Sequence, residues 1–252
     1  MTNKLITRRT ALISGLAALG GVTLARAWPK ELPPSYGNLL RMGDNLTYAA
    51  HRALIPERAL AKEYGVADIT SMPATGTLDP GTLNYPGLSE TYRRLHHGGF
   101  ADWRLSVEGL VARPGSFSLD ELKRMPSRTQ VTRHTCEEGW TAIAQWTGVP
   151  LSRVLDAAGI QPRARYVVFY SYDDWVDCLD LLDALHPQTL VAYGMNGRDL
   201  PLAHGAPARL RVERQIGYKS MKYLQRIVVT DKFDDGGTKG NIRNGWAWYT
   251  GI

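Results

Sequence analysis

The stretch Thr129–Leu151, TQVTRHTCEEGWTAIAQWTGVPL, contains the most informative pattern in the chain. Gln130–Thr135 is typical of a strand, and this strand leads directly into Cys136. Gly139 follows closely, so the cysteine lies on a turn. From Leu151 to Ala158, apolar residues recur at helical spacing after a proline, and a glycine comes next. The stretch therefore predicts a strand, a turn that presents a cysteine, and a helix.

Outward from this stretch, short strands outnumber helices. The patterns that predict strands cover Trp103–Glu108, Tyr166–Tyr170, Leu190–Tyr193, Leu210–Glu213 and Arg226–Thr230. These strands do not alternate with long helices, which argues against a doubly wound βαβ fold. We expect a β-rich, mixed α+β fold in a single domain.

Two local signals fix further boundaries. Ser118 followed by Glu121 is a capping box, which predicts a short helix over Leu119–Met125 that is stopped by the next proline. Asn196-Gly197 is a strong signal for a two-residue hairpin turn.

Composition excludes several classes of protein. The chain has 252 residues, of which 44% are hydrophobic and 21% charged, and this is ordinary for a folded globular protein. No continuous apolar run reaches the length of a membrane span. The two cysteines form no CxxC or CxxCH spacing, and no HExxH motif occurs, which disfavours zinc, c-type haem and iron–sulfur sites.

The first 27 residues resemble a secretory signal. Lys4 and the pair Arg8-Arg9 precede the apolar run Ala11–Leu24, and Ala25-Arg26-Ala27 offers a cleavage site. The arginine pair is typical of a twin-arginine signal, which predicts export of the folded protein to the periplasm. Four charges of the formal net +6 lie in this segment, so the rest of the chain is near neutral. The twin-arginine route commonly carries proteins that bind a metal cofactor before export.

The organisation that we expect has three parts. Residues 1–27 are a twin-arginine signal peptide, residues 28–100 an irregular N-terminal arm, and residues 101–252 the folded core. Proline, glycine and isolated aromatic residues dominate the arm. Its exception is Tyr48–Tyr64, which allows a helical piece broken at Pro56.

Cys136 is the first candidate for chemistry. Arg133 and His134 would favour its thiolate, whereas Glu137 and Glu138 would oppose it. Strand alternation allows only one of Arg133 and His134 to face a cleft easily. A buried inert cysteine and a disulfide with Cys178 are the alternatives that the residues alone leave open.

The second candidate is the basic stretch Arg209–Arg226. It holds six basic residues against the single acid Glu213, and Gly217, Tyr218 and Ser220 lie between them. Cations, a hydroxyl and backbone N–H groups in one segment suit a phosphate or another small anion. A solvated strand face is the alternative, and nucleic acid is disfavoured for a near-neutral chain.

Taken together, these segments resemble the sulfite-oxidase-type molybdopterin oxidoreductases, and most of all their short bacterial exported members, such as the periplasmic methionine-sulfoxide reductases. The motifs are Cys-x-x-Gly-Trp and Gly-Val-Pro-Leu in Thr129–Leu151, and then HPQTLVAYGMNG, HGAPARLRVERQIGYK and SMKYLQRI within Asp183–Ile227. The resemblance covers residues 40–252, and it implies that family's molybdopterin-binding fold.

The resemblance also implies a cofactor and a set of residues that bind it. The cofactor is molybdenum-molybdopterin, and Cys136 corresponds to the thiolate that binds the metal. Arg133 and His134, beside it in sequence, are candidates for orienting the substrate. The remaining positions that match cofactor contacts are Asn45, Tyr48, Ala49, Ser171, His204, Arg209, Ser220, Met221 and Lys222. His204 stands where the reductases have an asparagine, as in some sulfite oxidases.

The implied activity is transfer of an oxygen atom to or from a small sulfur or nitrogen oxide. Electrons would be exchanged with an external haem protein, and we expect a monomer. A sulfite dehydrogenase is the alternative within the family. Two alternatives come from other classes: a hydrolase that uses Cys136 with a histidine, and a non-catalytic protein that binds an anion.

Overall fold

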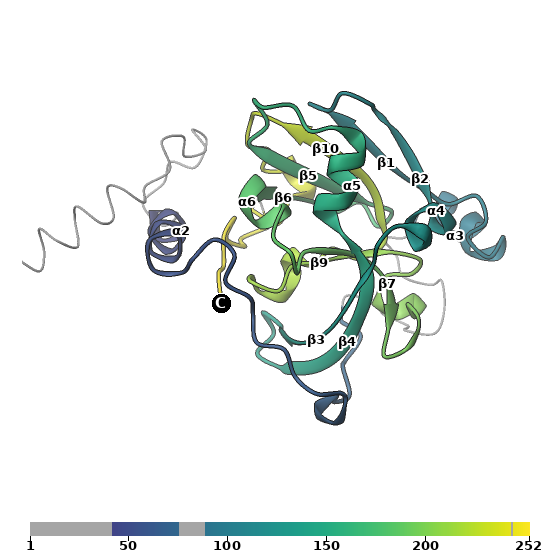
Figure 1. Cartoon of the computed structure of the whole chain (residues 1–252), viewed down its shortest axis with the longest axis horizontal. Coiled ribbons are helices and arrows are strands. Elements are labelled where there is room, and N and C mark those ends of the chain that lie inside the picture. The colour runs from purple at the N-terminus through teal and green to yellow at the C-terminus, as the bar shows by residue number, and fades with distance from the viewer. Residues whose placement is uncertain (1–41, 76–88, 243) are drawn as a thin grey trace, which may run out of the picture. The chain divides into compact units, whose positions relative to one another are not determined.

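The structure is a computed structural model, and it describes residues 42–75, 89–242 and 244–252. The signal peptide expected at residues 1–27 lies outside them. The described chain forms two compact units: residues 42–59 with Gly251, and the residues from Leu60 to Thr250 with Ile252. Figure 1 labels the helices and strands of both units. We expected the boundary between arm and core at residue 100, whereas the larger unit begins at Leu60.

The described residues contain five α-helices, which are α2 (Met42–Leu54), α3 (Glu90–His97), α4 (Leu119–Arg124), α5 (Leu151–Ala158) and α6 (Leu181–Ala184). Short 3-10 helices lie at η2 (Val66–Asp68), η3 (Leu202–His204), η4 (Gly217–Lys219) and η5 (Gly237–Lys239).

The described residues of the larger unit contain ten strands. They are β1 (Arg104–Gly109), β2 (Gly115–Ser118), β3 (Arg128–Thr135), β4 (Thr141–Pro150), β5 (Tyr166–Ser171), β6 (Val176–Asp180), β7 (Leu190–Met195), β8 (Arg198–Asp199), β9 (Arg209–Arg211) and β10 (Leu224–Thr230). The mixture of helices and β-rich sheets confirms the expected α+β class.

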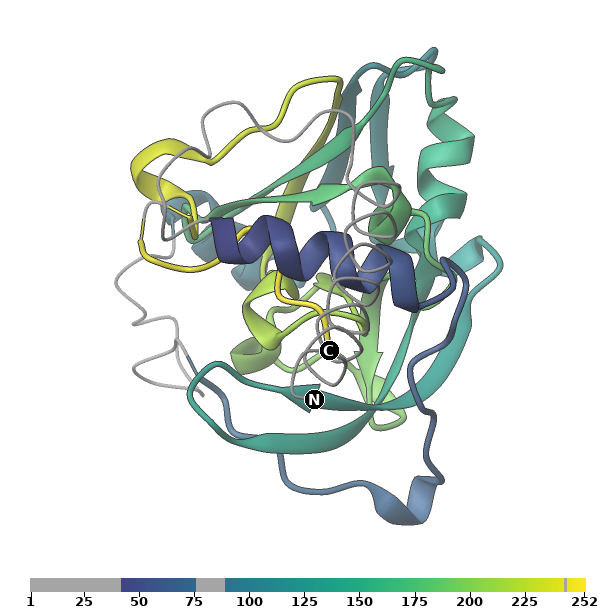
Figure 2. The ribbon, with the colours of Figure 1, turned by 90° about the vertical axis from the view of Figure 1, so that its left-hand side faces the viewer.

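Two five-stranded sheets organise these strands. The mixed sheet has the order β2-β1-β10-β5-β6, in which β1 and β10 are parallel and the other neighbours antiparallel. The antiparallel sheet has the order β3-β4-β7-β8, and β9 also pairs with β7. Figure 2 shows the long β3–β4 hairpin in teal and the chain after β10 in yellow.

One apolar core joins both sheets and α5. Leu151 and Leu155 of α5 are fully buried in it, with Phe169 from the mixed sheet and Val191 from the antiparallel sheet. Burying a large apolar side chain contributes about 1.5–3 kcal/mol relative to leaving it exposed. This core fixes the strand ends from which the loops described below project.

The local signals in the sequence are confirmed. Ser118 caps α4, with Glu121 completing the reciprocal box, and α4 ends just before Met125. Helix α5 spans Leu151–Ala158 and ends at a left-handed glycine. Asn196 and Gly197 both adopt positive φ angles, as a primed hairpin turn requires.

Other elements were not expected. Strand β4 buries Ala142, Ala144 and Trp146 on one face, and alanine gives too weak an apolar signal to reveal the alternation. Strand β6 is buried at every residue although it contains Asp177 and Asp180. Helix α3 lies within the segment that we expected to be irregular.

Candidate functional site

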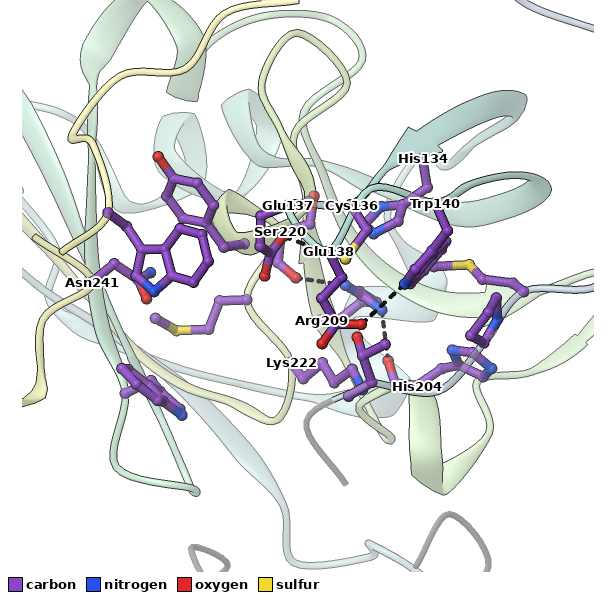
Figure 3. A pocket seen from close by; sticks show the side chains of 18 of the residues that line it. His134, Cys136, Glu137, Glu138, Trp140, His204, Arg209, Ser220, Lys222 and Asn241 are labelled. Carbon is purple, nitrogen blue, oxygen red and sulfur yellow. Dashed lines mark hydrogen bonds between the residues drawn. The ribbon is translucent and has the colours of Figure 1, made fainter. Parts of the chain in front are cut away.

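A cavity of about 410 Å³ lies among the loops that follow the strands of both sheets. Its wall includes the end of β3, the turn after β5, η3, β9, η4 and the segment after β10. Figure 3 shows Cys136, Arg209 and Lys222 facing this space. The cysteine turn and the basic stretch, which are far apart in the sequence, therefore meet in one site.

Cys136 lies on the tight turn that joins β3 to β4. Its backbone N–H donates to the carbonyl of Trp140 at 2.9 Å, and its carbonyl accepts from Gly139 at 3.1 Å. The thiol donates to a carboxylate oxygen of Glu137 at 3.5 Å. Burial, with a smaller contribution from Glu137, raises the pKa of this thiol to about 11. Cys136 is a free cysteine, and so is Cys178, which excludes the disulfide between them.

Two cations form one end of the cavity: Arg209, which is buried, and Lys222, which is partly buried. Arg209 donates to the carbonyls of His204 and Ser220, at 3.0 and 2.5 Å. Lys222 donates to the carbonyls of Thr75 and Ala203, at 2.5 and 2.7 Å. Among the described residues, neither cation forms an ion pair with a carboxylate. Both cations are hydrogen-bonded to backbone carbonyl groups and, in the part of the chain that the structure describes, not to carboxylates, so they remain available to an anion.

The electrostatics of this end support the same conclusion. Burial, followed by repulsion from Arg209, lowers the pKa of Lys222 to about 7. Burial and the neighbouring Arg211 lower the pKa of Arg209 to about 9. Nδ1 of His204 is buried without a hydrogen-bond partner among the described residues. An anionic ligand with acceptor oxygens would stabilise the charged forms of both groups and could accept a bond from His204.

Carboxylates and aromatic rings form the remaining wall. Glu137, Glu138 and Asp173 line the cavity, and burial raises the pKa of Asp173 to about 6. The aromatic and thioether side chains of the wall are Met72, Trp140, Trp175, Tyr218, Met221 and Trp246. The ring of Trp246 packs against that of Tyr218, with centroids 5.4 Å apart and a tilt of 35°. The cavity thus has a cationic end and a wall of carboxylates and apolar rings.

Seven of the residues expected from the sequence line the cavity, namely His134, Cys136, His204, Arg209, Ser220, Met221 and Lys222. Arg133 does not line it. Alternation along β3 turns Arg133 outward, where its guanidinium donates to the hydroxyl of Tyr64 at 2.6 Å, while His134 turns inward. Burial and the nearby Arg211 lower the pKa of His134 to about 2.

Ser171 lies one step behind the cavity wall. Its hydroxyl donates to the carboxylate of Asp173 and accepts from the backbone N–H of Trp175 at 3.0 Å. Asp173 and Trp175, rather than Ser171, line the cavity. Sequence reasoning missed both, because a carboxylate and an indole on a hairpin turn look like an ordinary solvated loop.

Asn45, Tyr48 and Ala49 lie on α2, in the smaller unit. Their spacing of three and four residues places them on one face of that helix. The structure does not place this unit relative to the cavity.

A cysteine thiol and two cations in one cavity suit an anionic, metal-bearing cofactor. The comparison with known families gives the class. The sequence model of the family named "oxidoreductase molybdopterin binding domain" matches residues 95–237, and the chain belongs to this family of molybdopterin-dependent oxidoreductases.

Curated relatives are similar to this chain over different lengths. The putative protein-methionine-sulfoxide reductase subunit YedZ1 of Azospira oryzae is 40% identical over 151 residues, which cover 60% of this chain and 56% of that protein. The protein-methionine-sulfoxide reductase catalytic subunit MsrP of Gluconobacter oxydans is 31% identical over 243 residues, which cover 88% of this chain and 69% of that protein. The chain spans about half the length of several other curated relatives.

A solved structure supports the fold. The sulfane dehydrogenase SoxCD of Paracoccus pantotrophus is similar with a TM-score of 0.50 and 26% identity, over 52% of this chain and 39% of that chain. No helix among the described residues has the length and apolar character needed to span a bilayer.

Proposed function

We propose that the protein is an exported molybdenum enzyme that removes the oxygen atom from an uncharged sulfoxide. The observation that carries the proposal is the shared cavity of Cys136, Arg209 and Lys222. The thiol end of the cavity suits the metal of the family's cofactor, and the cationic end suits its phosphate. A soft thiolate suits a redox-active metal, and buried cations suit a phosphate.

Each residue then has a role toward that cofactor. Cys136 would bind the metal, and His204, Arg209 and Lys222 would bind the phosphate, aided by the backbone at Ser220 and Met221. Ser171 would act through Asp173. Asn45, Tyr48 and Ala49 would complete the site from the N-terminal helix. When bound, the molybdenum cofactor supplies exchange of an oxygen atom coupled to two electrons.

The charge of the wall favours a neutral substrate. Glu137 and Glu138 directly follow Cys136 and line the cavity, and Arg133, which could have balanced them, faces away. A sulfite dianion would be repelled by these carboxylates. A sulfoxide carries no net charge, and its alkyl groups can contact Met72 and the tryptophans of the wall.

The overall reaction is balanced by an external reductant. One sulfoxide, two electrons and two protons yield one thioether and one water. We propose a reduced haem protein as the source of the electrons, and delivery of the folded protein to the periplasm by the twin-arginine signal at residues 1–27.

Sulfite oxidation is the second candidate, because His204 replaces the asparagine of the reductases and a sulfane dehydrogenase shares the fold. A Cys136-dependent hydrolase has weaker support: the thiol bonds to Glu137, and no described histidine is hydrogen-bonded to it. A non-catalytic anion-binding protein would need the cations but not the thiol.

The test uses the purified, cofactor-loaded protein. We expect reduced viologen to drive reduction of dimethyl sulfoxide and of methionine sulfoxide, free and in a peptide, and ferricyanide to give little turnover with sulfite. Metal analysis should find about one molybdenum per chain. Faster turnover of sulfite would replace the proposal with the second candidate, and an active protein without molybdenum would contradict both.

A further inference from the structure

His134 is the last inward-facing residue of β3 and lies beside the cysteine turn. It is buried, at 6% exposure, and it forms part of the cavity wall. Its ring is 5.5 Å from that of Trp140, measured between centroids. Its Nε2 faces Gly217, which also lines the cavity. His134 thus has one edge toward the cavity and the other toward the interior.

Arg211 occupies the interior edge. Its Nη1 lies 2.6 Å from Nδ1 of His134. The same guanidinium forms a forked ion pair with Glu213, at 3.3 and 2.7 Å, and lies 4.3 Å from the ring centroid of Trp146. Glu213 also accepts from Gln130 at 2.8 Å. Arg211 is 1% exposed, so its position is fixed on every side.

The chemistry of the pair decides where the ring carries its hydrogen. A guanidinium has only donors, so Nδ1 of His134 must accept the bond from Arg211. The hydrogen of a neutral imidazole then lies on Nε2. Among the described residues, Nε2 donates to no other group. It is therefore available to a ligand in the cavity.

We propose that Arg211 is a positioning residue that fixes His134 as a hydrogen-bond donor toward an oxygen atom bound beside Cys136. The ligand class is an oxide with an acceptor oxygen, and the sulfoxide of the proposed function is its member here. Only the identity of that ligand rests on the proposed function. The orientation of the ring rests on the contacts of Arg211, which does not itself line the cavity.

The first measurement determines which nitrogen of the His134 ring carries the proton. Histidine side chains are labelled with ¹⁵N in the cofactor-loaded protein, and the His134 signals are assigned by their loss in His134→Gln. We expect the proton on Nε2 and a bare Nδ1. A proton on Nδ1, or an equal mixture of both tautomers, would overturn the inference.

The second measurement follows the variants. Arg211→Lys keeps the charge but loses the planar fork, so both tautomers should appear in the spectrum. We expect kcat/KM for dimethyl sulfoxide to fall about 10- to 100-fold, as for loss of one hydrogen bond to a reacting group. Unchanged tautomer and unchanged kcat/KM would show that Arg211 positions nothing.

Two substitutions at His134 separate donation from packing. In His134→Gln, Arg211 would bond the amide oxygen, and the NH₂ group would face the cavity, so activity should stay within about tenfold of the wild type. His134→Leu has no donor and should lose activity to the level of Arg211→Lys or below. If Arg211→Lys fails to fold, the two His134 variants and the wild-type spectrum still test whether His134 acts as a hydrogen-bond donor. Equal activity of the glutamine and leucine variants would contradict the proposal.

The matched control is Arg226→Lys. Arg226 also pairs with a glutamate, Glu108 at 2.8 Å, and stacks on an aromatic ring, Tyr170 at 3.8 Å, but it does not line the cavity. It should leave the His134 spectrum and kcat/KM unchanged. A wild type that shows the Nε2 proton but reduces no sulfoxide would refute the proposed function and leave the orientation of His134 standing.

Discussion

Gly217 lies directly against the ring of His134, because a Cβ atom built on Gly217 would be 2.6 Å from Nε2. The same Cβ atom would be 3.1 Å from the carbonyl oxygen of Thr135. No side chain fits between η4 and the end of β3. The basic stretch can therefore pack this closely against the end of β3 only because residue 217 is a glycine.

The first prediction concerns this contact. Gly217→Ala should displace the imidazole or η4 and lower the free energy of unfolding by about 1–3 kcal/mol. Urea denaturation measures the loss, and the ¹⁵N spectrum should show a shifted His134. Gly115→Ala is the control, since a Cβ there meets nothing within 4 Å. Equal stability of the two variants would show that the contact has no energetic weight.

The second prediction concerns the metal. Cys136→Ser should fold normally but lower the molybdenum content at least about tenfold, because a hydroxyl is a poor ligand where a soft thiolate is needed. Elemental analysis of the purified protein checks this. Cys178→Ser should keep its molybdenum, because Cys178 lies in β6, outside the cavity wall. Full molybdenum in the Cys136 variant would remove this cysteine from the metal site.

The third prediction concerns the cationic end. Inorganic pyrophosphate at ten times its dissociation constant should stabilise the cofactor-free protein by about 1.4 kcal/mol. Lys222→Met should abolish most of this gain, measured by thermal unfolding. The control is Lys239→Met, which removes an exposed lysine that pairs with Asp174. Equal stabilisation of Lys222→Met and wild type would place the anion elsewhere.

The fourth prediction concerns pH. Burial, then Arg209 and Lys222, lower the pKa of His204 to about 4 from its ordinary 6.5. Between these two values the unfolded chain binds more protons, so stability falls as the pH falls through this window. Below pH 4 both states are protonated and this contribution ends.

His204→Asn removes the titrating group, so the cofactor-free variant should lose less stability than wild type between pH 6.5 and 4. After allowance for screening by water, we expect a difference on the order of 1–2 kcal/mol. Urea denaturation at both pH values measures it. His97→Asn, at an exposed histidine of α3, should behave like wild type. Identical pH dependence in all three proteins would contradict the prediction.

The sequence predicts those parts of the fold that depend on local chemistry. The capping box at Ser118, the helix after Pro150 and the Asn196-Gly197 turn each require only neighbouring residues, and the structure has all three. Strand β6 could not be recognised in this way. Asp177 is buried there because Lys219 pairs with it at 2.6 Å from a distant segment.

The site, too, combines residues that local sequence can predict with residues that only distant contacts bring in. The turn that carries Cys136 and the cluster around Arg209 could be selected from their residue types, and both line the cavity. Asp173 and Trp246 join them only because the turn after β5 and the segment after β10 meet there. Arg211 gave no signal beyond its charge, since its importance arises from its contact with His134.

The pairing of β1 with β10 has a consequence for synthesis. Strand β10 lies between β1 and β5, so the mixed sheet stays split until residues 224–230 have left the ribosome. Pairing of strands so distant in the chain is slow compared with local folding. A nascent chain therefore has no closed cavity to receive a ligand before β10 pairs, and loading must follow the synthesis of this strand.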